Sequence, residues 1–405
     1  MTAPAPWLTI IGIGADGVDG LAPRARDALA RAQTVFGGGR HLAMLPSDPA
    51  QDRISWPSPL DQPLPWISAR RGQPTCVLAS GDPFWYGIGA TLARTVPPAE
   101  MHVHPAPSAF SQAAARVGWP LQACRCLSVH GRALNRVRPW LHQGARLLIL
   151  SWDGTSADAL GRLLVGSGFG DSALTVLEHM GGPEERSRTG RAADWPGHET
   201  AALNTIAVDC VAAPEARVIP ATAGRPEALF DHTGQITKQE VRAVTLAALR
   251  PGRGERLWDI GAGSGSVGIE WMLADPGNHT VAVERDAARC RRLRDNAESC
   301  GVPDLECLEG SAPDALSGQP TPDAIFIGGG LTTPGLLDHC RAVLPRGGRL
   351  VANSVTVEGD ATLTRAAADH GGQLSRIAVS RAEPLGGFQG WQPLRPVTLW
   401  QLVVP

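Results

Sequence analysis

The sequence contains very little lysine and no excess of charge of one sign. Lys238 is the single lysine among 37 basic residues, an arginine bias that indicates a GC-rich genome rather than a function. The 39 acidic residues leave a net charge of −2. Because the chain has no global positive field, we expect no nucleic-acid partner, and any basic site must be local.

Long hydrophobic runs and clustered metal ligands are also absent from the sequence. The first apolar run, residues 7–14, has no basic leader, is short and ends in glycine, unlike a signal peptide or a membrane span. The closest cysteines, Cys124 and Cys126, have no second pair or histidine at a zinc-like spacing. We therefore expect a cytoplasmic protein with reduced structural thiols, no membrane contact and no metal.

The length and the pattern of apolar runs indicate two α/β domains. A chain of 405 residues exceeds the usual size of one hydrophobic core. Strand-like runs alternate with helical stretches up to residue 211, and a second, more regular alternation follows. Between them, residues 212–228 hold three prolines and no sustained period, as in a linker. We predict domains at residues 1–212 and 225–405.

Residues 257–271, LWDIGAGSGSVGIEW, hold two overlapping glycine patterns after a strand-like run. Gly261-x-Gly263-x-Gly265 is typical of S-adenosylmethionine sites, whereas Gly263-x-Gly265-x-x-Gly268 has the spacing of a dinucleotide fingerprint. Either pattern joins a strand to a helix by a tight turn whose backbone N–H groups face a ligand. The candidate contacts in this turn are Gly261, Ala262, Gly263, Ser264 and Gly265.

The surroundings of the turn favour S-adenosylmethionine. Asp259 lies two residues before Gly261, where it is expected to reach the methionine part of the ligand. Glu284 ends the next strand and can accept hydrogen bonds from both ribose hydroxyls, which either cofactor has. Five strand–helix units and two final strands, 373–382 and 397–404, also match the seven-stranded methyltransferase sheet better than a six-stranded dinucleotide domain.

Two later loops support the same interpretation. Residues 309–313 follow the third strand of the second half, where methyltransferases contact the adenine, so Ser311 and Ala312 are candidate contacts. The loop after the fourth strand, residues 326–330, reads FIGGG. It lacks the Asn/Asp-Pro-Pro-aromatic motif with which base methyltransferases stack a flipped base, which argues against a nucleic-acid substrate.

The motifs ITKQEVRA, RLWDIGAGSGSVGIE, AVERD, FIGGG and SRAEPLGG occur in this order between residues 234 and 405. This half resembles the carbon-15 methyltransferase and decarboxylase family of corrin biosynthesis. The resemblance implies a Rossmann-like, seven-stranded S-adenosylmethionine methyltransferase fold. One departure is Ser311, where the family usually has an acid; a serine hydroxyl can still hydrogen-bond an adenine amine, but without charge.

In the first half, GIGADG near the start and ASGDPFWYG some 70 residues later resemble the tetrapyrrole methylase family over residues 8–211. That family has a bilobal α/β fold with S-adenosylmethionine between the lobes. Ser108 also precedes a helical run, so a role as helix N-cap is an equal alternative for it. The resemblance implies a second cofactor site at Gly12, Gly14, Gly81, Asp82, Pro83, Ser108 and Ser111.

Both resemblances in one chain match the arrangement of the bifunctional C(5,15)-methyltransferases of corrin biosynthesis. This implies two S-adenosylmethionine sites and a small tetrapyrrole substrate, the reduced precorrin-6 ring. Methylation at carbons 5 and 15, with loss of carbon dioxide from the acetate on carbon 12, would give precorrin-8 for cobalamin. We also expect a homo-oligomer. A dinucleotide-dependent oxidoreductase, or a first domain that serves only as a docking module, are the alternatives.

Methyl transfer needs mainly positioning, whereas decarboxylation needs a proton donor for the new methyl carbon. His232, Lys238 and Glu240 are candidate donors that the sequence does not rank. Thr237 is a candidate cofactor contact, but Thr237 and Glu240 also have the spacing of a capping box, which would give both a purely structural role. Arg242 and Arg381 are expected to bind the carboxylates of the substrate.

Overall fold

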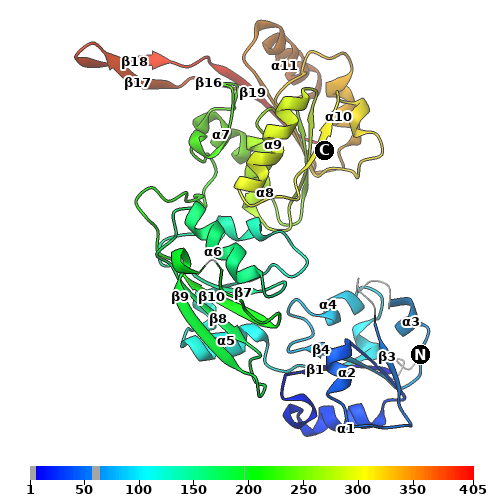
Figure 1. Cartoon of the computed structure of the whole chain (residues 1–405). Helices are drawn as coiled ribbons and strands as arrows, with labels where there is room; N and C mark the ends of the chain where they lie inside the picture. Colours follow the sequence, from blue (N-terminus) through cyan, green and yellow to red (C-terminus); the bar gives the residue numbers. More distant parts are fainter. Residues whose placement is uncertain (1–5, 57–63, 196) are drawn as a thin grey trace. The chain divides into compact units, whose positions relative to one another are not determined.

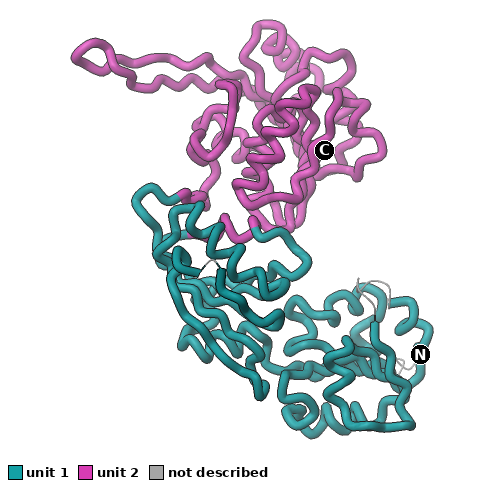
Figure 2. Tube along the Cα trace, in the orientation of Figure 1, with its two compact units in different colours: residues 1–134, 142–216 teal, residues 135–141, 217–405 magenta. Residues whose placement is uncertain are grey.

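The computed structural model describes residues 6–56, 64–195 and 197–405 and divides the chain into two compact units (Figure 2). Unit 1 consists of Met1–Leu134 and His142–Ala216, and unit 2 of Asn135–Leu141 and Arg217–Pro405. Both units contain strands and helices in alternation, so the α/β class expected from the sequence is confirmed. No helix in the described ranges is long and apolar enough to cross a bilayer.

The first sheet of unit 1 is parallel and has the order β3-β2-β4-β1-β5. Its central strands are buried apolar runs, as expected where both faces of a parallel sheet are covered. Its strands are β1 (Leu8–Ile13), β2 (Thr34–Gly37), β3 (Asp52–Ser55), β4 (Thr75–Ser80) and β5 (Met101–His104). Its helices are α1 (Pro23–Arg31), α2 (Gly39–Ala43), α3 (Leu64–Ser68) and α4 (Ile88–Leu92).

The second sheet of unit 1 is mixed and has the order β6-β7-β10-β8-β9. Only the β6–β7 pair is parallel. The strands are β6 (Cys124–Ser128), β7 (Arg146–Leu150), β8 (Ala173–Glu178), β9 (Arg186–Arg191) and β10 (Asn204–Asp209). Two helices accompany this sheet, α5 (Ala109–Val117) and α6 (Ser156–Gly166).

Unit 2 is built on a seven-stranded sheet of order β13-β12-β11-β14-β15-β19-β16. The first five strands in this order are parallel, and β19 runs antiparallel to both neighbours. The strands are β11 (Arg256–Ile260), β12 (His279–Glu284), β13 (Glu306–Glu309), β14 (Ala324–Ile327), β15 (Arg349–Ser354), β16 (Gln373–Ile377) and β19 (Val397–Val403). The helices are α7 (Gln239–Leu249), α8 (Ser266–Ala274), α9 (Ala287–Ser299), α10 (Leu336–Val343) and α11 (Val357–His370).

Alternate residues of the central strands of unit 2 belong to two different cores. Leu257 and Phe326 pack in one cluster, and Trp258 and Ile325 pack in the other. Both faces of the sheet are therefore buried, which leaves the carboxyl edge of β11, β12 and β14 as the place where loops can meet a ligand.

The structure corrects the end of the second half. The expected strand 373–382 ends at Ile377, and a separate hairpin follows, made of β17 (Ser380–Leu385) and β18 (Phe388–Pro393) (Figure 1). The sequence did not predict this hairpin. Its large apolar side chains are mostly exposed to solvent: the exposed fractions of Leu385, Phe388 and Trp391 are 69%, 82% and 78%.

The proline-containing segment 212–228 is more than a linker. Beyond Ala216 it belongs to unit 2, and Ile219 and Arg225 are each only 3% exposed. The backbone N–H groups of Gly224 and Arg225 donate to the carboxylate of Glu270 on α8 at 2.8 and 2.9 Å. An irregular segment held by such bonds shows no period in its sequence, which explains the difference from the expectation.

Candidate cofactor sites

The glycine turn of unit 2 lies between the buried end of β11 and the start of α8. Gly261, Gly263 and Gly265 have φ values of +70°, +59° and +77°. This left-handed region is costly for residues with a Cβ atom, so the spacing of the glycines follows from the turn itself.

The surroundings of the three glycines differ. A Cβ atom on Gly261 would lie 2.5 Å from the Cα atom of Gly329, and one on Gly265 would lie 2.6 Å from Cγ of Leu293. A Cβ atom on Gly263 would meet no atom of the residues that the structure describes within 4 Å. Gly261 and Gly265 thus allow close internal packing, whereas Gly263 presents bare backbone to open space, as a ligand-binding turn requires.

Glu284 lies beside this turn at the end of β12 and is 4% exposed. Its Oε2 atom accepts a hydrogen bond from the N–H of Gly263 at 3.0 Å, and Oε1 accepts one from the N–H of Asp286 at 3.1 Å. The carboxylate is therefore fixed next to the open side of Gly263, where it can accept further hydrogen bonds from a ribose.

Asp259 is 1% exposed on β11, and its Oδ2 atom accepts a hydrogen bond from the N–H of Gly268 at 2.9 Å. Its Oδ1 atom has no partner in the described part of the chain. Burial, with a smaller contribution from the charge of Glu284, raises the pKa of Asp259 to about 7. A buried oxygen without a partner is costly, and a cationic ligand group would satisfy it. This fits the ammonium of S-adenosylmethionine.

Other predicted contacts lie around the same turn. Gly310 N–H donates to the carbonyl of Glu284 at 3.0 Å, which brings the loop of Ser311 and Ala312 beside β12. Ser311 is exposed and Ala312 is 8% exposed. Ala262 N–H donates to Val283, and Ser264 is buried. The structure thus brings the predicted residues of this turn and these strand ends together, while their contacts with a ligand stay a prediction.

The structure contradicts the capping box that was the structural alternative for Thr237 and Glu240. The N-cap of α7 is Lys238, and its side chain makes no capping hydrogen bond. The carboxylate of Glu240 is instead held by Arg381 on β17, at 3.1 Å to Nε and 2.7 Å to Nη2. The role of Thr237 as a cofactor contact stays a prediction.

Four charged residues form what we call the Arg381 network: Glu227, Lys238, Glu240 and Arg381. Nη2 of Arg381 also donates to Glu227 at 2.7 Å, and Nζ of Lys238 lies 3.1 Å from the same carboxylate. Hydrogen bonding to Arg381 lowers the pKa of Glu240, so this carboxyl group is ionised at neutral pH and is a poor proton donor. The side chain of Arg381 remains 37% exposed.

Arg242 is not available to a substrate, contrary to the prediction from the sequence. The residue is fully buried, and its Nε donates to Glu270 at 2.6 Å. Its two Nη groups donate to the carbonyls of Thr237 and Arg225. Since its nitrogens already have partners inside unit 2, Arg242 stabilises the fold rather than binding substrate carboxylates.

In unit 1, the predicted glycines meet at the carboxyl ends of β1 and β4. A Cβ atom on Gly12 would lie 1.9 Å from the carbonyl oxygen of Gly81, so this close approach requires glycine. Gly81 has φ +58°; its N–H donates to Ile13 at 3.2 Å and its carbonyl accepts from Ala106 at 3.3 Å. Gly12 and Gly81 therefore bring the two loops together.

The rest of this predicted site forms tight local turns. A Cβ atom on Gly14 would lie 2.4 Å from Oδ1 of Asp16. Oδ1 of Asp82 accepts from the N–H of Phe84 at 2.8 Å, and the carbonyl of Pro83 accepts from Gly89 at 2.8 Å. These contacts shape the turn, and a cofactor role for the three residues stays a prediction.

For Ser108, the N-cap alternative is confirmed. Its Oγ accepts from the N–H of Ser111 at 3.1 Å in the first turn of α5, and the two hydroxyls lie 3.0 Å apart. Ser108 is 7% exposed. A second role for Ser108 and Ser111 in lining a ligand cleft stays a prediction.

A polar cluster that was not predicted from the sequence lies at the same edge of unit 1. Nε2 of His41 lies 3.0 Å from Oγ of Ser80, which directly precedes Gly81, and Nη2 of Arg40 donates to this hydroxyl at 3.3 Å. Burial, followed by the charge of Arg40, lowers the pKa of His41 to about 4, so the imidazole is neutral. The glycine run 37–39, which begins at the last residue of β2, repeats the pattern of strand, glycine turn and helix and could have indicated this cluster.

The fold and the site of unit 2 define a class of protein. A parallel strand, a left-handed glycine turn, a helix and an acid at the end of the next strand are the arrangement with which α/β sheets bind nucleoside cofactors at their carboxyl edge. Residues 7–196 match the family Tetrapyrrole (Corrin/Porphyrin) Methylases, and residues 228–404 match the family Precorrin methyltransferase domain. Both families use S-adenosylmethionine as methyl donor.

A Sinorhizobium protein named precorrin-6Y C(5,15)-methyltransferase (decarboxylating) is 52% identical over 98% of this chain and 96% of its own. Two Salmonella typhimurium proteins match shorter stretches. The cobalt-precorrin-6B C(15)-methyltransferase (decarboxylating) is 34% identical over 40% of this chain and 85% of its own. The cobalt-precorrin-7 C(5)-methyltransferase is 31% identical over 44% of this chain and 88% of its own. The chain belongs to the precorrin-6Y C(5,15)-methyltransferase (decarboxylating) family and is a methyltransferase.

Proposed function

We propose that the protein methylates the precorrin-6 ring at carbons 5 and 15 with S-adenosylmethionine and decarboxylates the acetate on carbon 12, giving precorrin-8. Unit 1 methylates carbon 5, and unit 2 carries out the other two steps. The observation that carries the proposal is the full-length match to the Sinorhizobium protein of that name. The division of labour is supported by the two separate Salmonella enzymes, each matching less than half of the chain.

Two cofactor sites follow from this proposal, one in each unit. For unit 2, the strand order, with five parallel strands and a closing antiparallel pair, supports a class I methyltransferase fold. Gly263, Asp259 and Glu284 fit S-adenosylmethionine, because bare backbone, a buried carboxylate oxygen with no partner among the described residues and a fixed carboxylate meet at one edge. For unit 1, the site is proposed at the loops of Gly12 and Gly81.

S-adenosylmethionine, when bound, supplies a methyl group on a sulfonium that is open to in-line displacement by a ring carbon. The protein then needs mainly to hold the carbon in near-attack geometry, which can lower the barrier by ~7–11 kcal/mol. In unit 2, Asp259 and Glu284 orient the methionine and ribose ends. Their positions do not depend on the substrate, because backbone N–H groups fix one oxygen of Asp259 and both of Glu284.

Decarboxylation requires a proton for the new methyl carbon, and the three candidate donors differ in their ability to supply it. Glu240 is the weakest, since its pKa is lowered by Arg381. Nζ of Lys238 carries N–H donors and lies 3.1 Å from Glu227, and Nδ1 of His232 accepts from the N–H of Gly234 at 3.0 Å, so this ring can donate only from Nε2. We propose Lys238 or His232 as donor and the exposed side of Arg381 as a carboxylate contact.

The division between the units is tested with Glu284→Ala. Loss of a charged acceptor for the ribose should cost ~1.5–3 kcal/mol, roughly 10- to 100-fold in affinity. Under limiting S-adenosylmethionine, this variant should still methylate carbon 5 and lose methylation at carbon 15 together with decarboxylation. Product mass and carbon-labelled NMR measure this. Glu358→Ala, an exposed acid on α11, is the matched control. Equal loss of both methyl groups would contradict separate sites, and retained carbon-15 methylation would contradict the assignment to unit 2.

The hairpin β17–β18 supports the proposal of a homo-oligomer. A two-stranded ribbon is marginally stable alone, and its exposed Leu385, Phe388 and Trp391 would be covered by a second copy of the chain. A cytoplasmic location stays a prediction.

A further inference from the structure

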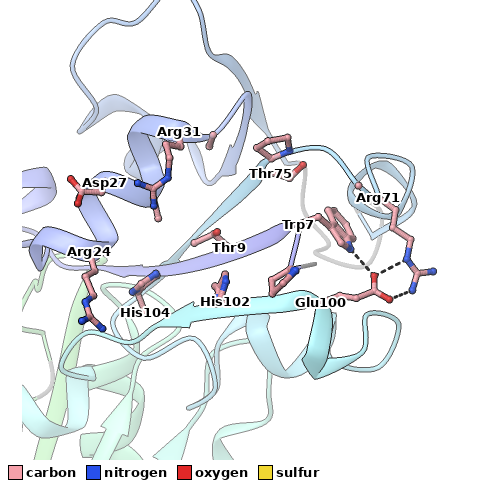
Figure 3. Close-up of a pocket in the computed structure, with 15 residues that line it drawn as sticks. Trp7, Thr9, Arg24, Asp27, Arg31, Arg71, Thr75, Glu100, His102 and His104 are labelled. Atoms are coloured by element: carbon pink, nitrogen blue, oxygen red, sulfur yellow. Dashed lines mark hydrogen bonds and ion pairs between the residues drawn. The ribbon is translucent and has the colours of Figure 1, made fainter. Parts of the chain in front are cut away.

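A cavity of about 1150 Å³ lies in unit 1 between helix α1 and the first sheet (Figure 3). Thr9 on β1 is in register with His102 on the edge strand β5, and Ile11 is in register with His104. Ile11 packs in the same cluster as Ala25 and Leu29 of α1. Side chains alternate between the faces of a sheet, so both histidines lie on the face that α1 covers.

Helix α1 turns a charged face toward these histidines. The lining residues Arg24, Asp27, Ala28 and Arg31 follow the spacing i, i+3, i+4 and i+7, which places them on one side of the helix. The small side chain of Ala28 leaves room between the longer ones. Ala25 and Leu29 of the same helix are buried against the sheet, whereas Arg24, Asp27 and Arg31 are exposed, so the charged side of α1 borders the open part of the cavity.

The charge of the cavity is unbalanced. At one end, Glu100 is neutralised by Arg71 and also accepts from Nε1 of Trp7 at 2.7 Å. Arg24 and Arg31 form no hydrogen bond or ion pair within the described ranges, and Asp27 is the remaining acid of the lining. Burial is the main cause that lowers the pKa of His104, and the nearby charges of His102 and Arg24 add to this effect.

We propose that this cavity binds a small polyanion, whose carboxylate or phosphate oxygens are held by Arg24, Arg31, His102 and His104. Guanidinium groups bind both kinds of oxyanion in the same bidentate manner, and imidazole rings add N–H donors. The hydroxyl of Thr9 lies on the same face as a further donor. The volume exceeds that of a single inorganic anion and suits a ligand of several such groups. The site is separate from the carboxyl-edge loops of Gly12 and Gly81, and it does not depend on the proposed function.

Calorimetry on the full chain tests the site, with citrate and pyrophosphate as probes at low ionic strength and S-adenosylmethionine at saturation. Each lost guanidinium should weaken binding about tenfold, so Arg24→Gln/Arg31→Gln should raise the dissociation constant roughly 100-fold. The control is Arg94→Gln, an exposed arginine of the same unit outside the cavity, and it should bind like the wild type. Binding of citrate alone would indicate a carboxylate ligand, and binding of pyrophosphate alone a phosphate ligand.

Imidazole NMR provides a second readout that needs no arginine variant. The probe that binds should raise the pKa of His104, because an anion offsets the neighbouring positive charges. The His104 resonance is identified by its loss in His104→Asn. The proposal is overturned if neither probe binds saturably, if the double variant binds as tightly as the wild type, or if the His104 titration is unchanged by a saturating probe.

Discussion

Glu270 occupies the centre of a buried charge cluster in unit 2, and Glu270→Gln should destabilise that unit strongly. Glu270 and Arg242 are fully buried and Arg225 is 3% exposed. Oε1 accepts from Nε of Arg242 at 2.6 Å and from Arg225 N–H at 2.9 Å. Oε2 accepts from Gly224 N–H at 2.8 Å and from Nη1 of Arg225 at 3.3 Å. One carboxylate thus compensates two guanidinium groups.

Glutamine keeps the shape of this side chain but not its chemistry. One oxygen becomes an NH₂ group, and whichever way the amide is turned, two donors then face its hydrogens. Both guanidinium groups also lose their counter-charge. Breaking a buried ion pair by removing one partner typically costs about 3–5 kcal/mol. For a unit of this size, 1 kcal/mol shifts the midpoint by roughly 2–4 °C, so the transition of unit 2 should fall by about 10 °C.

Differential scanning calorimetry of the full chain measures this effect, since unit 1 provides an internal reference. Glu358→Gln, on the exposed surface of α11, should shift neither transition by more than about 1 °C. A double-mutant cycle with Arg242→Met separates charge pairing from packing: the loss in the double variant should be smaller than the sum of the single losses. A shift of Glu270→Gln as small as that of Glu358→Gln would refute the reasoning.

Three further predictions concern unit 2. Gly265→Ala should lower the stability of unit 2 more than Gly263→Ala, because both variants add about 1 kcal/mol of backbone strain but only the Cβ atom at position 265 overlaps with the core. Gly263→Ala should mainly weaken S-adenosylmethionine binding, and a wild-type affinity of this variant by calorimetry would contradict a ligand beside Gly263. The folded state raises the pKa of Asp259 from 3.8 to about 7, so the folded unit holds a proton that the unfolded chain releases. The stability of unit 2 against urea should therefore fall as the pH rises from about 4 to about 7. If the stability of Asp259→Asn changed with pH in the same way as that of the wild type, this prediction would be wrong. Trp391→Ser should reduce the molar mass in light scattering without changing the unfolding of unit 2, and an unchanged mass would argue against an oligomer through the hairpin.

Local sequence determined the parts of the site in which one segment dictates its own geometry. The left-handed turn at Gly261, Gly263 and Gly265 needs glycine because each φ value is positive, so this turn could be predicted from the sequence. The place of Glu284 could also be predicted, because a residue at the end of a parallel strand lies at the ligand-binding edge of the sheet. The alternation of strands and helices likewise indicated the α/β class of both units.

Only the tertiary structure decided which side chains are free to act. Arg242 and Arg381 look alike in the sequence, yet Arg242 is fully buried against Glu270, whereas Arg381 pairs with two acids on other segments and keeps an exposed side. The three glycines look equivalent, yet only Gly263 faces open space. The reason is physical: backbone conformation is set by neighbours along the chain, whereas burial, ion pairing and open space depend on segments that are distant in sequence and meet only when the chain folds.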